Sequence, residues 1–268
     1  MNWFIKLILL FTGTMQEPKA FGWFHILTLS IALLLVVTVY LLRNKFTNKH
    51  LNLLLAVYGF GSLLLEIIKQ LTWSCNYDAM TNLATWDYPW YIFPFQLCST
   101  PMYVALLCLF LKNGKIKDAL YSYLAFVTIL GSLAVVFIPG DCFVPDIWVN
   151  IQTTWLHYGS LAISLILVII NKVKLNFTSY KQAILTALIF ITIANTMNIV
   201  VYNSGILNGE TFNMFYIGPY FISSLPVFNT IYQNVPYVIF LASYILAIIL
   251  GSGIIYFLHK QLSKLKRA

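Results

Sequence analysis

The stretch GWFHILTLSIALLLVVTVYLL, residues 22–42, decides the fold class. It contains no Asp, Glu, Lys or Arg, and it is long enough to cross a bilayer, which takes roughly 20 apolar residues in a helix. Six further stretches of mostly apolar residues follow, at about 51–71, 92–111, 119–138, 147–171, 182–202 and 235–258. The sequence therefore predicts an all-α, polytopic membrane bundle of about seven transmembrane helices.

Composition supports this prediction and excludes a soluble domain. Hydrophobic residues make up 60% of the 268 positions and charged residues only 9%, whereas soluble domains are nearer half apolar and a quarter charged. The net charge of +8 comes from short loops and not from a basic face interleaved with aromatic residues. We therefore expect no nucleic-acid partner, and we interpret the cations as orientation signals facing anionic lipid.

The loop cations predict the orientation of the chain. Thirteen of the sixteen Lys and Arg residues fall on alternate loops and on the C-terminal tail. They are Arg43, Lys45, Lys49, Lys112, Lys115, Lys117, Lys172, Lys174, Lys181, Lys260, Lys264, Lys266 and Arg267. The intervening loops have no Lys or Arg and contain Asp78, Asp87, Asp141, Asp146 and Glu210. Positive loops stay inside, so we expect a multi-pass protein of the cell membrane with a cytoplasmic C-terminus and an external N-terminus.

The ends of the chain are expected to differ from the bundle. Residues 1–20 begin with a short apolar run after Lys6, which favours an interfacial helix on the outer surface, with a signal peptide as the alternative. Residues 21–260 form one transmembrane domain, and residues 261–268 form a basic cytoplasmic tail. Within the domain, the stretch 211–233 is apolar but interrupted by Gly and Pro, so we expect it to lie in the interface or to re-enter the membrane.

Polar residues from five predicted helices share one level beneath the outer surface, while the inner halves are almost purely apolar. Because polar side chains are costly in a membrane, such residues indicate a functional site by default. The sequence predicts a water-accessible pocket at this level, opening outward or sideways into the outer leaflet. Its candidate residues are His25, Glu66, Lys69, Gln96, Cys98, His157, Asn195 and Asn198.

Each candidate also has a structural interpretation. Glu66 and Lys69 are i,i+3 neighbours that neutralise one another, and the amides act as hydrogen-bonding glue between helices. Cys98 shares the level of His157, and an imidazole that stabilises a thiolate would make a Cys–His nucleophile pair. Cys75 and Cys142 fall in outer loops, where a disulfide is an open alternative to free thiols. Short metal-ligand spacings and nucleotide motifs are missing from the sequence, so we expect no metal and no cofactor.

Several short motifs in order along the chain are similar to those of a known family. They are FGWFH at 21–25, FPFQLC at 93–98, IPGD at 138–141, LHYG at 156–159 and the Asn-rich segment ending at Asn203. The chain resembles the YwaF-like family of small bacterial membrane proteins, which is related to a human Cys/His ether-phospholipid acyltransferase of the transmembrane-protein type. More distantly it is similar to the androgen-induced hydrolases of fatty-acid esters, which use Thr and His.

The resemblance implies a role for two of the candidate residues. Cys98 would be the acyl-accepting nucleophile and His157 its base. In one respect the chain departs from the family, in which a His often precedes the cysteine by two residues. Gln96 occupies that position here. A proton transfer that depends on this His would need another group in this protein.

Two hypotheses of different classes follow. The first is a membrane acyltransferase or transacylase, or an acyl-ester hydrolase, that uses Cys98 and His157 on a phospholipid or another acyl lipid, with Asn195, Asn198 or Gln96 as oxyanion donors. The second is a transporter or ligand-binding protein that uses the same pocket without covalent chemistry, with Glu66 and Lys69 as a coupling pair. A membrane subunit that only binds a protein partner is a third interpretation, and the sequence identifies no such partner.

Overall fold

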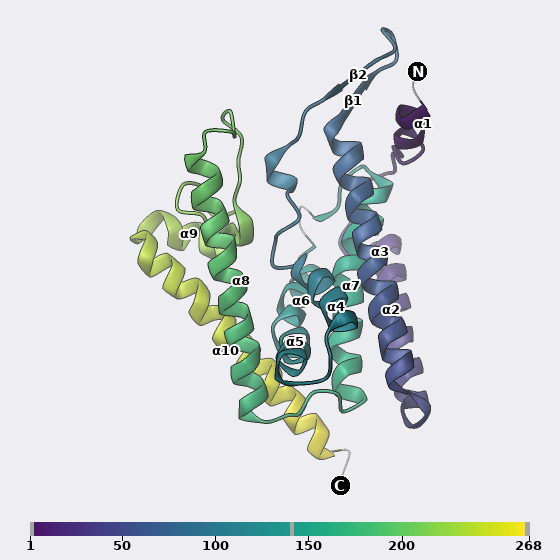
Figure 1. Cartoon of the computed structure of the whole chain (residues 1–268), viewed down its shortest axis with the longest axis vertical. Coiled ribbons are helices and arrows are strands. Elements are labelled where there is room, and N and C mark those ends of the chain that lie inside the picture. Colours follow the sequence, from purple (N-terminus) through teal and green to yellow (C-terminus); the bar gives the residue numbers. More distant parts are fainter. Residues whose placement is uncertain (1–2, 140–141, 266–268) are drawn as a thin grey trace.

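The computed structural model describes residues 3–139 and 142–265, and it is almost entirely helical (Figure 1). The helices are α1 Trp3–Leu9, α2 Trp23–Leu42, α3 Asn48–Ser74, α4 Thr100–Phe110, α5 Lys115–Phe126, α6 Thr128–Phe137, α7 Ile147–Ile169, α8 Phe177–Asn203, α9 Pro226–Asn234 and α10 Tyr237–Leu265. The described residues also form the short 3-10 turns η1 Arg43–Lys45, η2 Trp90–Ile92 and η4 Met214–Tyr216 and the strands β1 Cys75–Asp78 and β2 Leu83–Trp86.

Six helical stretches of the described chain are long and apolar enough to cross a membrane. They are α2, α3, α5 with α6, α7, α8 and α10. With the short α4 counted as the third crossing, successive crossings run in opposite directions, so the lysine-rich loops and the end of α10 lie at one end of the bundle and the β-hairpin at the other (Figure 1). The prediction of an all-α, polytopic helical membrane protein is confirmed.

The third crossing differs from the predicted helix over 92–111. Helix α4 begins only at Thr100, and residues 93–99 form bends and turns. At ~1.5 Å per residue α4 covers about 16 Å, roughly half of a hydrocarbon layer ~30 Å thick. Pro94 disfavours a helical residue before it, and Pro101 fits the first turn of α4, where no backbone N–H is required. The third crossing is therefore irregular in the half nearer the β-hairpin and helical in the half nearer the lysine-rich loops.

Other boundaries also differ from the sequence prediction. The predicted helix over 119–138 is divided into α5 and α6 at Val127, and the stretch 211–233 contains η4 and α9 but no spanning helix. A β-hairpin, in which Cys75 is opposite Trp86, follows α3 and was not predicted. Within the described residues 3–20, only the seven residues of α1 are α-helical, and the interfacial position of this segment stays a prediction.

The predicted basic tail is only partly described. Helix α10 continues through Leu265, so residues 261–265 extend this helix and do not form a separate tail, while 266–268 lie outside the described residues. The last two residues of the motif at 138–141 lie outside them as well.

The centre of the bundle is formed by α5, α6 and α7. About 72% of the spanning window of α5 with α6 and 67% of that of α7 are buried, against 11% for α2. Small hydroxyl side chains join the central helices: Ser132 lies 2.6 Å from Ser160, and Thr128 lies 3.3 Å from Ser164, oxygen to oxygen. Such residues permit close helix approach and provide interhelical hydrogen bonds in membranes. Helix α7 is thereby fixed in rotation.

Gly59 sets the close approach of α3 to α4, and we predict that Gly59→Val destabilises the fold. A Cβ atom at Gly59 would lie 2.8 Å from Cδ2 and 2.9 Å from Cγ of Leu106. Overpacking of this kind typically costs about 1–3 kcal/mol. The measurement is the thermal unfolding midpoint of the purified protein in a nonionic detergent. Gly131→Val is the matched control, because a Cβ there meets nothing within 4 Å. Equal losses in both variants would contradict the packing role of Gly59.

Candidate functional site

Cys98 lies in a turn directly before α4 and not inside a helix as predicted. The turn is closed by two hydrogen bonds: the Ser99 N–H donates to the Gln96 carbonyl (2.9 Å) and the Thr100 hydroxyl to the Leu97 carbonyl (2.7 Å). Thr100 Oγ1 also lies 2.6 Å from the Tyr123 hydroxyl of α5. A helix N-terminus favours negative charge, so this position suits a thiolate.

His157 lies in the middle of α7. This helix is capped by Asp146, whose side chain accepts hydrogen bonds from the N–H groups of Trp148 (2.9 Å) and Val149 (3.2 Å). His157 Nδ1 lies 2.8 Å from the Thr153 carbonyl. A carbonyl can only accept, so Nδ1 carries the proton and Nε2 of the neutral ring is left as the acceptor.

The Cys98 thiol and the His157 ring are close enough to interact electrostatically, although they come from different crossings. The sequence places them only at the same approximate depth; the structure brings them together. Two tyrosines, Tyr58 of α3 and Tyr123 of α5, are close enough to Cys98 to interact with it electrostatically. The site is thus a thiol beside an oriented imidazole, enclosed by α3, α5 and α7.

Glu66 is the centre of a second polar cluster beside this pair. Its carboxylate lies 2.7 Å from Lys69 Nζ and accepts hydrogen bonds of 2.7 Å from the side-chain amides of Gln70 and Gln152. Both Glu66 and Lys69 interact electrostatically with Cys98. The contact between Glu66 and Lys69 is the geometry expected if these two charges neutralise one another. Gln152, which was not among the candidates, ties this cluster to α7.

Two of the candidate side-chain amides form hydrogen bonds with backbone groups. Gln96 donates to the Asn213 carbonyl (3.1 Å) and accepts from the Phe215 N–H (2.7 Å), while Asn198 donates to the Met214 carbonyl (3.0 Å) and accepts from its N–H (2.6 Å). Both amides therefore bind the segment around η4, which covers this part of the bundle. These contacts fit a structural role as hydrogen-bonding links between segments better than a role in stabilising an oxyanion.

The remaining two candidates lie apart from the pair. Asn195 accepts a hydrogen bond from the Tyr237 hydroxyl (2.6 Å). The buried His25 accepts from the Phe21 N–H at Nδ1 (3.0 Å), and its ring stacks on Tyr158 with 5.7 Å between centroids. His25 therefore contacts a different face of α7 from that of His157.

The other cysteines show no disulfide: Cys75 and Cys142 are not joined to each other in the described structure. Partial burial raises the pKa of the Cys75 thiol, which makes it a poor nucleophile. Cys108 is completely buried in α4. Among residues 3–139 and 142–265 no group of three or more His, Cys, Asp or Glu side chains is arranged to hold a metal ion.

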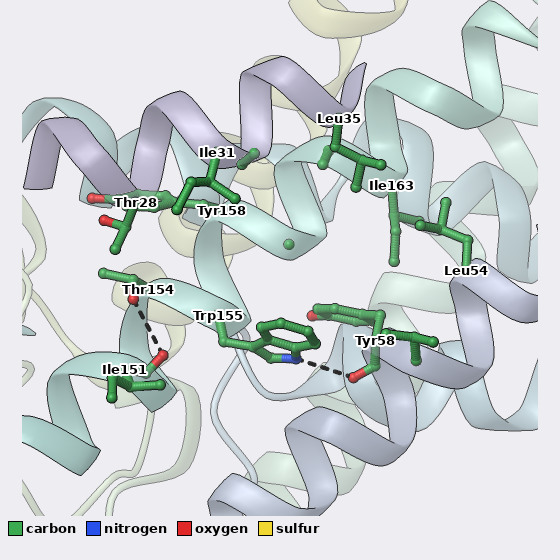
Figure 2. A pocket seen from close by; sticks show the side chains of 14 residues that line it. Thr28, Ile31, Leu35, Leu54, Tyr58, Ile151, Thr154, Trp155, Tyr158 and Ile163 are labelled. Carbon is green, nitrogen blue, oxygen red and sulfur yellow. Dashed lines mark hydrogen bonds between the residues drawn. The ribbon is translucent and has the colours of Figure 1, made fainter. Parts of the chain in front are cut away.

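An apolar cavity of about 430 Å³ lies between α2, α3 and α7 (Figure 2). Its walls include Ile31 and Leu35 of α2, Leu54 and Tyr58 of α3, and Trp155 of α7, whose indole N–H donates to the Tyr58 carbonyl (3.3 Å). Exposed side chains such as Ile31, at 61% exposure, border it on the lipid side. The sequence predicts a polar pocket, whereas this cavity is apolar.

Tyr58 connects the cavity to the pair. Its ring lines the cavity, and its hydroxyl donates to the carbonyl of Leu156, the residue before His157 (3.1 Å). Sequence reasoning did not select Tyr58, because an aromatic residue on an apolar helix carries no distinctive signal. The irregular segment around Cys98 did have a signal, namely Pro94 and Pro101 in the predicted third helix.

The fold defines a multi-pass helical membrane protein in which a thiol and an imidazole from different crossings interact. The TMEM164 family matches residues 20–256, nearly the whole chain, and the protein belongs to this family. This match confirms the family resemblance inferred from the sequence motifs. Among the curated proteins and among the solved structures, no match was found.

We predict that Glu66→Ala strongly destabilises the protein. The substitution leaves the Lys69 ammonium and the Gln152 amide without their 2.7 Å partner in a largely buried place. Breaking a buried ion pair typically costs about 3–5 kcal/mol. The measurement is chemical unfolding in detergent, and the matched control is the double variant Glu66→Ala/Lys69→Met, which removes the unpaired charge. The double variant should regain much of the lost stability; if it is no more stable than Glu66→Ala, the ion pair is not the cause.

Proposed function

We propose that this protein is a membrane acyltransferase or transacylase that moves a fatty acyl chain between lipids, with Cys98 as nucleophile and His157 as base. The interaction between the Cys98 thiol and the His157 ring carries the proposal. It is supported by the hydrogen bond from His157 Nδ1 to the Thr153 carbonyl, because this leaves Nε2 to accept the thiol proton. The family resemblance implies the same two residues.

In the first step, His157 Nε2 takes the proton of Cys98 as the sulfur attacks the carbonyl carbon of an acyl ester. The bond between this carbon and the ester oxygen breaks, the imidazolium returns its proton to the leaving alkoxide, and a thioester remains on Cys98. In the second step, an acceptor hydroxyl gives its proton to His157 and attacks the thioester, which releases the thiolate to be reprotonated. With water as the acceptor, the same steps make a hydrolase.

Negative charge that develops in these steps needs stabilisation. Gln96 and Asn198 are engaged with backbone around η4, so they are poor oxyanion donors in this arrangement. The start of α4 is a better source, since Cys98 directly precedes it and a helix N-terminus favours anions. The positive Lys69, which interacts with Cys98, adds to this field.

The apolar cavity gives the acyl chain a place to bind. It opens toward lipid between spanning helices, and Tyr58 joins its wall to the Leu156–His157 backbone. A lipid chain can enter it from the bilayer without crossing water. With the predicted orientation, the Cys98 turn is in the outer half of the membrane, where cytosolic acyl-CoA has no access. The acyl donor is therefore another lipid, and we place the activity in the cell membrane.

We predict that Cys98→Ala abolishes acyl transfer and that His157→Ala lowers its rate by roughly 10²–10⁴, the usual contribution of a general base. The measurement is transfer of a labelled acyl chain from phospholipid by purified protein in vesicles. In the wild type, rapid quenching should capture the label on Cys98 as a thioester that hydroxylamine cleaves.

Cys75→Ala is the matched control, because it removes a thiol from the β-hairpin, away from His157. It should keep full activity. Full activity in both Cys98→Ala and His157→Ala would refute the proposal. Solute uptake into vesicles that is lost in Glu66→Gln and retained in Cys98→Ala would instead favour the transporter hypothesis.

We predict that Leu35→Trp shifts the acyl-chain preference toward shorter chains, because Leu35 lines the cavity. Loss of room for about two methylene groups should lower the rate with long chains on the order of tenfold. Leu34→Trp is the control on the same helix, since Leu34 is 65% exposed and is not part of the lining. The measurement is a series of labelled donors of increasing chain length. A parallel change in both variants would show that the cavity does not hold the chain.

A further inference from the structure

A second hollow, of about 420 Å³, lies at the end of the bundle that carries the lysine-rich loops. It is formed where α3 begins, where α4 passes into α5, and where α7 passes into α8. Its polar lining residues are Lys112, Lys117, Lys172, Asn48, Asn52 and Asn113. Three cations from two separate junctions thus surround one cavity, and no Asp or Glu is part of this lining.

Lys117 is the buried member of this group. Lys117 is only 7% exposed. Its Nζ donates to the Leu111 carbonyl (3.1 Å) and lies 5.9 Å from the centre of the Tyr121 ring. An ammonium group has three N–H donors, and burying a charge is costly unless it is paired. The Leu111 carbonyl and the Tyr121 ring satisfy only part of the hydrogen-bonding and charge requirement of the Lys117 ammonium group.

Lys172 approaches the same ring. Its Nζ donates to Asn48 Oδ1 (3.1 Å) and lies 5.6 Å from the centre of the Tyr121 ring. The ion pair found among the described residues is Lys69–Glu66. None of the three lysines that line the hollow therefore has a described carboxylate oxygen within 4.0 Å of its Nζ. Asp118 acts electrostatically on Tyr121 but does not line the hollow. The positive charge of the hollow is therefore uncompensated.

We propose that this hollow binds a phosphate group. Its oxygens would accept hydrogen bonds from the three ammonium groups and from the asparagine amides, and its negative charge would balance the buried Lys117. Lysine is a frequent phosphate ligand as a point charge, and inner-leaflet headgroups present phosphate at this level. The phosphate is that of an anionic lipid headgroup or of a free phosphate compound.

General attraction of basic loops to the membrane does not account for this arrangement. Lys115 and Lys174 belong to the same two connections but do not line the hollow. The site is also separate from the proposed catalytic pair, because the full length of α4, about 16 Å, lies between Cys98 and Lys112. The two proposals can therefore fail independently.

The experiment measures thermal stabilisation of the full-length protein in a nonionic detergent at constant ionic strength. One arm titrates inorganic phosphate and pyrophosphate, and the other titrates phosphatidic acid against phosphatidylcholine. Stabilisation by phosphatidic acid alone identifies a lipid headgroup as the source, and stabilisation by inorganic phosphate as well identifies phosphate itself. Either result supports the site. If the phosphate compounds give no more stabilisation than chloride at equal ionic strength, the proposal is overturned.

Lys112→Gln and Lys172→Gln should each weaken the apparent affinity roughly tenfold, as expected for one charged hydrogen bond. Lys112 is exposed and Lys172 half-buried, so both variants can keep the fold. Lys115→Gln and Lys174→Gln are the matched controls, with the same charge change in the same connections. Equal weakening in all four variants would reduce the effect to bulk charge and overturn the site.

Discussion

The irregular backbone before α4 depends on one constraint: inside a bilayer, peptide groups must find partners within the protein. Two side-chain amides meet part of this demand. Gln96 bonds to backbone on either side of Met214, and Asn198 bonds to both the N–H and the carbonyl of Met214 itself. These four hydrogen bonds join the segment before α4 to the segment around η4 and to α8. Without them, two stretches of non-helical chain would have unpaired polar groups at membrane depth.

This arrangement also determines where the thiol lies. A continuous third helix would have put Cys98 on a helix face with its backbone fully engaged. Because the helix starts two residues later, the thiol lies at a helix N-terminus and beside His157 of α7. The rotation of α7 is fixed in turn by the hydroxyl contacts of Ser160 and Ser164 with α6. Helix packing and the irregular turn therefore act together to form the pair.

Much of the fold could be predicted, because membrane helices are read from length and apolarity alone. The spans containing α2, α3 and α7 were placed within about three residues, and those containing α8 and α10 were placed with one end too short. The depth argument put Cys98 and His157 at one level, and the two side chains interact in the structure. The irregular segment before α4 was not predicted, because its many apolar residues indicate a helix more strongly than Pro94 indicates a break. The roles of Gln96 and Asn198 could not be predicted, because their partners are backbone groups more than a dozen residues away, in a segment without regular structure. The hairpin after α3 could not be predicted, because its two short strands show no clear alternation of apolar and polar residues.

Helix α3 has a consequence for how the protein meets its surroundings. Its 27 residues measure about 40 Å, longer than a typical hydrocarbon layer, and β1 follows at once without a loop. The hairpin therefore continues directly from the end of a helix that is longer than such a layer is thick. Its tip, where Met80 is 94% exposed, stands farther out than the neighbouring connections (Figure 1). A large water-soluble molecule that approaches from that side would touch this tip before it reached the bilayer.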